Sequence, residues 1–492
     1  MGRKSQSKQS QKKNIGKENN KFIQNRKELN VLIDKVLKLT SIFQAACNVS
    51  KSWEHHLEIN ELLRLITNIE IGYGSKNKRN PRQANIEKYL KWLRENGAQF
   101  DGVKIAEFEG YELGLKTTKD FKEGSLILTV PANVMMSERN AQESELSEFI
   151  KVDPLLQNMP NITLALFLLL EKNNQESFWK PYIDILPEKY TTVLYFTPEE
   201  LTALKPSPVF ESALKLYRSI ARQYAYFSNK IHSLDIPVLK KLQEIFTFDN
   251  YRWAVSTVMT RQNNIQLGNS DVTAFIPLWD MCNHEHGKIT TDFNKKLGRG
   301  ECYALRDFRE GEQIFIFYGA RSNADLFLHN GFVYCNNKYD SLSLTLGISS
   351  GDPLRDTKLS VLNKLGLAGV THYSLYQGEN PVSPELLAFI RIFNMNQEEL
   401  TKWSSIGLPS DLVSSDSTSS TAIGEIIERR AHKYLLTRCQ LIRAAYDRES
   451  EDKEPENIHR KNVKLLKQCE VQILDGAIKY LENVLKNLPG IE

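Results

Sequence analysis

The spacing of apolar residues divides the chain into helical and strand-like stretches. Over residues 26–71, apolar positions recur three and four residues apart, which predicts helices. A polar stretch at residues 72–82 interrupts the pattern. A further helix is predicted over Ile86–Asn96, because the spacing resumes there and Gly97 follows as a helix C-cap. The chain therefore begins with a helical segment, which we take as residues 26–100.

Beyond this segment, short apolar runs predict strands over residues 103–105, 113–117 and 125–130. The sequence Lys-Asp-Phe-Lys-Glu-Gly at residues 119–124 returns as Arg-Asp-Phe-Arg-Glu-Gly at residues 306–311, again before an apolar strand. Each copy is interpreted as a hairpin, since Asp and Gly tolerate turn conformations. Two matching hairpins indicate one β-domain whose halves are separated by an insertion.

Helices are predicted in the insertion, at about residues 138–265, and in the last third of the chain. Those of the insertion are Asn161–Lys172, Pro208–His232 and Asp249–Arg261. After a β-like stretch, those of the last third are Pro384–Met395, Gly424–Asp447 and Asn462–Leu488, with loops at Ser404–Thr421 and Glu449–Glu456. The last third is thus interpreted as a separate helical module.

Composition indicates an ordinary globular protein. The 492 residues are 41% hydrophobic and 25% charged, enough for roughly three domains. The net charge is +4, but the first 20 residues hold six cations and one anion, so the rest is nearly neutral. This balance argues against nucleic-acid binding. The basic tail, residues 1–25, is expected to be disordered, with nuclear import or an anionic surface as the alternative.

The cysteines and the apolar runs indicate an intracellular protein. Six cysteines lie far apart without a Cys-x-x-Cys pair, which favours reduced thiols. No apolar signal segment follows the start, and the most apolar run, Ile162–Leu170, is too short to span a membrane. We therefore expect a soluble, cytoplasmic protein, and whether the basic tail also directs some of it to the nucleus stays open.

The densest group of chemically active residues is Ile-Pro-Leu-Trp-Asp-Met-Cys-Asn-His at 276–284, followed by Tyr318. His284 and His286, together with Asp280, suggest a metal site, but a third strong ligand at a fixed spacing is missing, so no metal is expected. Cys282 suggests a covalent nucleophile, yet nothing marks an oxyanion hole. Taken singly, each residue also fits a structural role.

In combination these residues resemble the SET-domain methyltransferases. The Asn-His pair after Trp-Asp, the Tyr of Ile-Phe-Tyr-Gly at 316–319 and the strand pair around Glu112-Leu113-Gly114 carry the resemblance. Relatives have Gly-aromatic-Gly at this last place, so the first Gly is lost here. The insertion and the helical C-terminal part are similar to the Rubisco-methyltransferase branch. Further stretches resemble the group within it that methylates one histidine of actin, among them Met-Thr-Arg-Gln-Asn at 259–263.

The resemblance implies an α+β fold, with a mostly-β SET domain over residues 101–340 and an all-α substrate-binding domain over residues 341–492. It implies S-adenosylmethionine as the cofactor and actin as the protein substrate. We also expect a monomer, and the charge balance and apolar runs predict no nucleic-acid or membrane partner. Asn283 and His284 would contact the cofactor's adenine and amino-acid ends, and Phe332 would pack on the adenine. The implied cofactor-binding residues are Arg82, Tyr111, Glu112, Leu113, Arg261, Asp280, Met281, Cys282, Asn283, His284, Asn330, Gly331 and Phe332.

The reaction itself needs positioning more than a strong base. Imidazole, with a pKa of ~6.5, is mostly neutral at cytosolic pH, whereas a lysine with a pKa of ~10.4 must first lose a proton. Asn263 would fix the tautomer of the target imidazole, unless it merely caps a helix. By resemblance, Tyr318 lies against the imidazole, and the pocket is completed by Trp279, Ile316 and Arg321.

Two other functions remain open from the sequence. One is a protein-lysine methyltransferase of the same fold, for which an aromatic residue would be expected in place of Asn263. The other is an actin-binding scaffold that has lost turnover.

Overall fold

The computed structural model describes residues 24–42, 49–71, 81–406, 412–413, 424–448 and 457–488. Most of the predicted basic tail, of the polar stretch after residue 71 and of the two predicted C-terminal loops lies outside these residues. The chain forms two compact units. The first holds residues up to Tyr195 and Ala213–Gly319, and the second holds Phe196–Ser212 and the chain from Ala320. The division falls within helix α10, Val209–Ser233.

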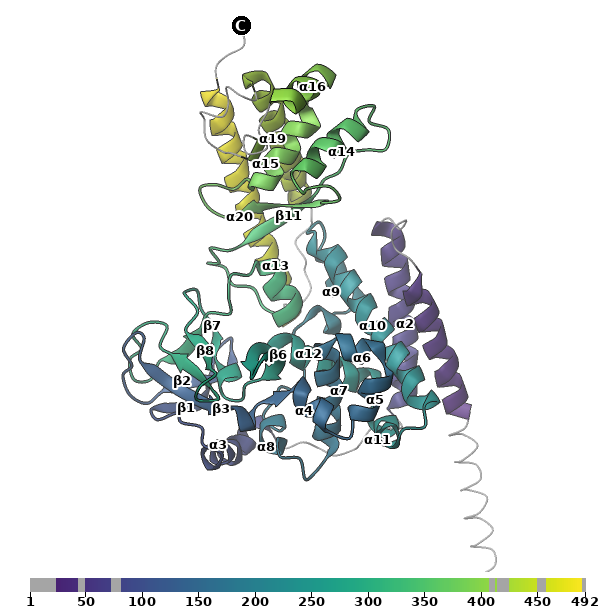
Figure 1. The fold of residues 1–492 in the computed structure, drawn as a ribbon, viewed down its shortest axis with the longest axis vertical. Coiled ribbons are helices and arrows are strands. Elements are labelled where there is room, and N and C mark those ends of the chain that lie inside the picture. The colour runs from purple at the N-terminus through teal and green to yellow at the C-terminus, as the bar shows by residue number, and fades with distance from the viewer. Residues whose placement is uncertain are drawn as a thin grey trace, which may run out of the picture. The chain divides into compact units, whose positions relative to one another are not determined.

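The first unit combines β-strands with a helical part, and Figure 1 shows β1, β2, β3, β7 and β8 gathered beside α3 and α8, with α4 to α7, α11 and α12 farther along. A helix over residues 24–41 precedes the numbered helices. Those are α2 Val49–Glu70, α3 Ile86–Glu95, α4 Glu138–Glu143, α5 Ser147–Val152, α6 Pro154–Asn158, α7 Pro160–Asn173, α8 Lys180–Ile183, α10, α11 Pro237–Ile245 and α12 Phe248–Arg261. The strands are β1 Val103–Phe108, β2 Glu112–Thr117, β3 Leu126–Pro131, β4 Met136–Ser137, β5 Asn263–Leu267, β6 Ser270–Phe275, β7 Asn283–His284, β8 Thr291–Asn294, β9 Arg299–Tyr303 and β10 Gln313–Ile316.

Three sheets form the β-part of this unit. Their orders are β1-β2-β10-β7, β3-β9-β8 and β4-β6-β5. The three strands predicted between residues 103 and 130 are confirmed as β1, β2 and β3, and the strand after the second Asp-Phe motif is confirmed as β10.

The two Asp-Phe motifs are not hairpins, because the strands that each one joins lie in different sheets. Instead, β2 pairs with β10 and β3 pairs with β9. The turns pair with each other as well: the Phe121 N–H donates to the Phe308 oxygen at 2.8 Å, and the Phe308 N–H donates back at 2.9 Å. The hairpin prediction was therefore wrong, but the inference drawn from it, one β-domain from two distant halves, is confirmed.

The helical insertion supplies the core beside these sheets. The strongly apolar run of the sequence is α7, whose residues from Ile162 to Leu170 are all buried, as expected for a central helix that packs on every side. Pro160 begins it at the first helical position, where the missing N–H costs nothing. All three helices predicted for the insertion are confirmed, as α7, α10 and α12.

The N-terminal helices are tied to this core by buried polar groups. Arg218 of α10 donates to the carbonyl oxygens of Leu39 and Thr40, which end the helix over residues 24–41. A cation is favourable at a helix C-terminus, where carbonyls lack partners. Glu70, the last residue of α2, accepts hydrogen bonds from the Tyr224 hydroxyl and, at 2.8 Å, from the Phe248 N–H.

The second unit is helical, with one small sheet. Its helices are α9 Pro198–Thr202, α13 Asn323–Asp325, α14 Arg355–Lys364, α15 Pro384–Asn394, α16 Gln397–Ile406, α19 Glu425–Asp447 and α20 Ile458–Asn487, and a π-helical turn spans Leu326–Asn330. Strands β11, Ser341–Thr345, and β12, His372–Tyr376, pair antiparallel. The all-α expectation for the C-terminal part therefore needs this correction, because only the first of the two strands was predicted.

None of the helices in the described ranges has the length and apolarity that a membrane span requires.

Candidate active site

The last residue of α12 directs its side chain at the turn that precedes β7. The helix ends at Arg261 because Gln262 is extended. Arg261 Nη1 lies 2.7 Å from the Asp280 carbonyl oxygen and 3.3 Å from Asp280 Oδ2. Burial acts to lower the pKa of Arg261, but the Asp280 carboxylate and nearby phenols outweigh it, so this pKa is raised. Arg261 is therefore a permanent buried cation.

Asp280 is the counter-charge, with a side chain that is 2% exposed. The Tyr182 hydroxyl of α8 donates to Asp280 Oδ2. Burial raises the pKa of Asp280, and Arg261 and Tyr182 oppose that rise. The ion pair is thus held by hydrogen bonds from two separate elements.

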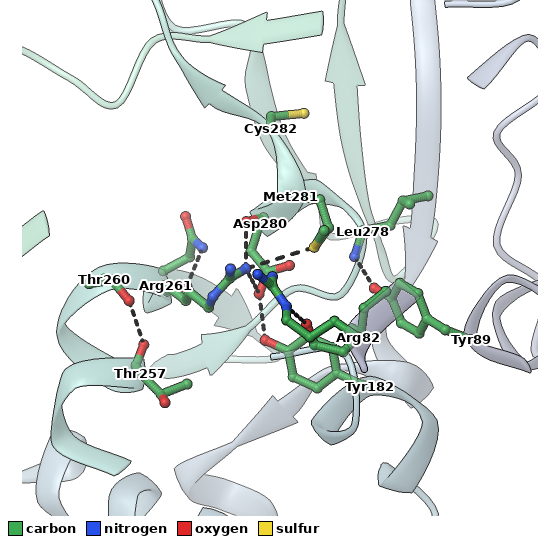
Figure 2. Close-up of polar contacts among 12 residues, drawn as sticks. Arg82, Tyr89, Tyr182, Thr257, Thr260, Arg261, Leu278, Asp280, Met281 and Cys282 are labelled. Atoms are coloured by element: carbon green, nitrogen blue, oxygen red, sulfur yellow. Dashed lines mark hydrogen bonds and ion pairs between the residues drawn. The ribbon is translucent and has the colours of Figure 1, made fainter. Parts of the chain in front are cut away.

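A second arginine lies beside this pair, as Figure 2 shows. Arg82 Nε donates to the Ile185 oxygen at 2.8 Å, and Arg82 Nη1 lies 2.9 Å from Glu112 Oε2. Burial, and then repulsion from Arg261, lower the pKa of Arg82. Its partner Glu112 has a largely exposed side chain. Arg82 therefore offers a cation whose present partner faces solvent.

The turn before β7 is fixed in an uncommon conformation. Leu278 has φ +70°, which is rare for a bulky residue without a local reason. Its N–H donates to the Tyr89 hydroxyl at 2.6 Å, so a side chain from α3 holds the turn (Figure 2). The conformation of Leu278 therefore fixes the direction in which the chain continues to Asp280 and β7.

Strand β7 brings the Asn-His pair next to Tyr318. β7 runs parallel to β10, with Asn283 opposite Phe315 and His284 opposite Ile316. The Tyr318 N–H donates to His284 Nδ1 at 3.2 Å, and the Tyr318 hydroxyl donates to the Cys282 oxygen at 2.7 Å. The sequence thus predicted residues that lie together in the structure, although Tyr318 is 34 positions beyond His284.

Other predicted residues have mainly structural contacts here. Asn263 Nδ2 donates to the Arg261 oxygen at 3.1 Å, which caps the end of α12. Trp279 is buried. A Cβ built on Gly300 would lie 3.1 Å from a carbon of the Trp279 ring, so this ring packs directly on the backbone of β9. Tyr111 packs edge-on against Phe315 with 5.5 Å between ring centroids. Asn263, Trp279 and Tyr111 remain predicted site residues without a direct test.

The remaining predicted residues near the turn are buried in the first unit. They are Leu113, Met281, Cys282 and Ile316. A hydrogen bond to Cys302 and burial raise the pKa of the Cys282 thiol far above its usual value. This disfavours the thiolate, and with it the covalent alternative.

Four predicted residues belong to the second unit: Arg321, Asn330, Gly331 and Phe332. Arg321 Nη1 donates to Asn330 Oδ1 at 3.2 Å. Asn462 of α20 donates to the Gly331 oxygen at 2.9 Å, and Gly331 has φ +79°, a conformation that favours glycine. This segment is thus fixed by contacts within its own unit.

Sequence reasoning missed Tyr89 and Tyr182, which hold the turn and the ion pair. A tyrosine in an amphipathic helix gives no signal that distinguishes a core ring from a hydrogen-bond donor. As for metals, no group of three or more His, Cys, Asp or Glu converges in the described ranges.

Two stretches of the chain match known protein domains. Residues 112–319 match the SET domain, and residues 349–487 match the Rubisco LSMT substrate-binding domain. The actin-histidine N-methyltransferase of Danio rerio is 38% identical over 460 residues, which cover 92% of this chain and 77% of the relative. The chain belongs to the SET-domain family that contains the actin-histidine N-methyltransferases.

Within this SET family, the Gallus gallus actin-histidine N-methyltransferase is 42% identical over 377 residues. The match covers 74% of this chain and 63% of that relative's length. A solved structure of Rubisco LSMT bound to AdoMet has the same fold, with a TM-score of 0.63 at 22% identity over 83% of this chain and 93% of the other. The structure of the LSMT SET domain bound to lysine and AdoHcy agrees, with a TM-score of 0.64 at 23% identity over 82% and 92%.

Proposed function

We propose that this chain transfers a methyl group from S-adenosylmethionine to a histidine side chain of actin. The observation that carries the proposal is the 38% identity, over 92% of the chain, to a relative named for that reaction. The cluster of Arg261, Asn283, His284 and Tyr318 supports it, because these are the residues through which the sequence resembles that group.

The residues present fit the charges of this cofactor. S-adenosylmethionine has a carboxylate at one end, which requires cations or N–H donors. Asn283 Nδ2 is buried and has no hydrogen-bond partner among the described residues, so it is a donor that lacks an acceptor. Arg82 can exchange its exposed partner Glu112 for a ligand carboxylate at little cost, because exposed ion pairs contribute little. When bound, the cofactor supplies an electrophilic methyl group on a sulfonium.

The chain's own part in the reaction is to orient the acceptor. The Asn263 amide nitrogen donates to the Arg261 oxygen, which leaves the amide oxygen as the acceptor for an imidazole N–H. A hydrogen bond there fixes the tautomer and leaves the lone pair of the other ring nitrogen for the methyl group. Tyr318 is fixed through Cys282 and His284, so its ring can form one side of the acceptor site. Bringing the reactants into line is the main way in which a protein accelerates such a transfer.

The deciding experiment incubates the purified chain with unmodified actin and isotope-labelled S-adenosylmethionine, and maps the label by mass spectrometry. We expect label on one histidine. Activity should fall as the pH drops below ~6.5, where imidazole is protonated. A lysine acceptor, as in the protein-lysine alternative, would instead gain activity up to a pH of ~10. Label on lysine, or none on actin, would contradict the proposal.

A variant pair tests the role of Asn263. Asn263→Phe removes the hydrogen bond to the imidazole and should lower histidine methylation about tenfold or more. The control is Asn264→Phe on the same strand. The Asn264 side chain is exposed and accepts a hydrogen bond from the Thr273 hydroxyl at 3.3 Å, and this variant should keep its activity. Equal activities in the two variants would exclude tautomer control by Asn263.

A further inference from the structure

Two buried amide groups on one face of the four-stranded sheet lack an acceptor. Gln313 is 8% exposed. In the described part of the chain, neither Gln313 Nε2 nor Asn283 Nδ2 has a hydrogen-bond partner. A buried donor without a partner costs about 1–3 kcal/mol and is rare in native proteins. Two of them at one place indicate a ligand that supplies acceptors.

The two amide groups meet above Gly114. A Cβ built on Gly114 would lie 2.7 Å from Gln313 Nε2 and 3.0 Å from Asn283 Nδ2. The strand order explains this convergence, because β10 lies between β2, which carries Gly114, and β7, which carries Asn283. A Cβ at residue 114 would therefore displace both amide nitrogens.

A cation is held at the start of the same strand. Glu112, two residues before Gly114, begins β2 with a left-handed backbone, φ +56°. Arg82 Nη1 is 2.9 Å from the Glu112 carboxylate. Two N–H donors with a guanidinium close by are the surroundings that a carboxylate requires.

We propose that Gln313 is a further cofactor-binding residue, which donates together with Asn283 to the carboxylate at the amino-acid end of S-adenosylmethionine. This inference rests on the proposed function and names a contact within it. Gln313 was not among the residues implied by the sequence.

The test compares two ligands that differ only at the amino-acid end. S-adenosylhomocysteine retains the carboxylate, and 5′-methylthioadenosine lacks that end. Dissociation constants are measured by titration calorimetry on the full chain. In Gln313→Met, which keeps length and removes the amide, we expect the Kd for S-adenosylhomocysteine to rise about tenfold. The Kd for methylthioadenosine should stay within about twofold of the wild type.

Gln313→Glu sharpens the test, because it directs a carboxylate at the ligand's carboxylate. Gln313→Glu should raise the Kd for S-adenosylhomocysteine more than Gln313→Met does. The matched control is Gln243→Met in α11, which loses a satisfied hydrogen bond to the Ile231 oxygen away from the site and should leave both constants unchanged. If Gln313→Met fails to fold, Gly114→Ala serves instead, since its Cβ displaces both amide nitrogens and should give the same ligand difference.

An unchanged Kd for S-adenosylhomocysteine in Gln313→Met would overturn the inference. Equal weakening of both ligands would overturn it as well, because the amide would then act on the nucleoside. If the wild-type chain binds neither ligand, the proposed function fails together with the inference.

Discussion

Two regions hold the β-part of the first unit together by opposite means. The paired Asp-Phe turns lie at the surface, and a backbone N–H of each turn donates a hydrogen bond to the aspartate of the other. Asp120 Oδ1 accepts from the Glu310 N–H at 2.8 Å, and Asp307 Oδ1 accepts from the Glu123 N–H at 2.9 Å. The same contact therefore occurs twice with the two halves exchanged.

The cluster around Arg261 is the opposite case. Its contacts are buried, and none of them is repeated by a second, matching segment. Asp280 is held by Arg261 and by Tyr182, a residue 98 positions away, and the turn is held by Tyr89, 189 positions from Leu278. An exposed charge is still solvated by water when its partner is removed, whereas a buried charge is then left uncompensated. The comparison teaches that removing one member of an ion pair costs little free energy at the surface and much in the interior.

The largest expected effect is in the buried cluster. Asp280→Ala leaves the Arg261 guanidinium buried without its counter-charge, and we expect a loss of about 3–5 kcal/mol in the free energy of unfolding. Urea denaturation of the ligand-free protein measures it. The double variant with Arg261→Met should lose less than the two single changes together, because they share one interaction. A loss below about 1 kcal/mol for Asp280→Ala would mean that the pair contributes no more than a surface contact.

A smaller effect is expected at Glu70, a second buried carboxylate. Burial raises the pKa of Glu70 to about 7, against hydrogen bonds from Tyr224 and Phe248. Asp249 raises this pKa further, and Arg26 lowers it. Between its ordinary pKa and about 7, the folded state holds a proton that the unfolded state releases, so this contribution to stability is lost as the pH rises through that window.

The measurement compares the wild type with Glu70→Gln by urea denaturation at pH 5 and pH 8. From pH 5 to pH 8, the free energy of unfolding of the wild type should fall by about 2 kcal/mol more than that of Glu70→Gln. Identical pH dependence in both proteins would show that Glu70 titrates normally in the folded state.

The smallest effects are expected at the paired turns. Gly124 and Gly311 have φ +75° and +91°, and a Cβ meets nothing within 4 Å at Gly124 and only Lys116 at 4.0 Å at Gly311. Each Gly→Ala change should therefore cost about 1 kcal/mol from backbone strain alone, and both should cost the same. Lys122→Ala, which removes an exposed ion pair with Asp307, should leave the free energy of unfolding nearly unchanged. Clearly unequal glycine variants would contradict the equivalence of the two turns.

Much of the fold could be predicted from the sequence because periodicity reports burial. Three helices of the insertion, α7, α10 and α12, and strands β1, β2 and β3 were located, since apolar spacing shows which face of an element is buried. The repeated Asp-Phe motif indicated one domain from distant halves. Its pairing was misjudged because a turn motif does not say which strand lies next to it.

The candidate site was predicted in part. Asn283, His284 and Tyr318 were named from a resemblance, and β7 and β10 bring them together. Tyr89 and Tyr182 were not named, because their pattern is that of ordinary core residues, and Gln313 was not, because a polar residue at the start of a strand gives no signal of its own.

The sequence by itself determined where the longer helices and the strands β1, β2, β3 and β10 lie, which residue types are available and which family they resemble. Only the tertiary structure decided that Tyr182 meets Asp280, that Tyr89 holds Leu278, and that two amide groups converge on Gly114. The physical reason is that local spacing fixes which way a side chain faces, whereas its partner depends on how distant elements pack. Hydrogen bonds and buried charges are short-range and directional, so the packing of those elements determines their partners.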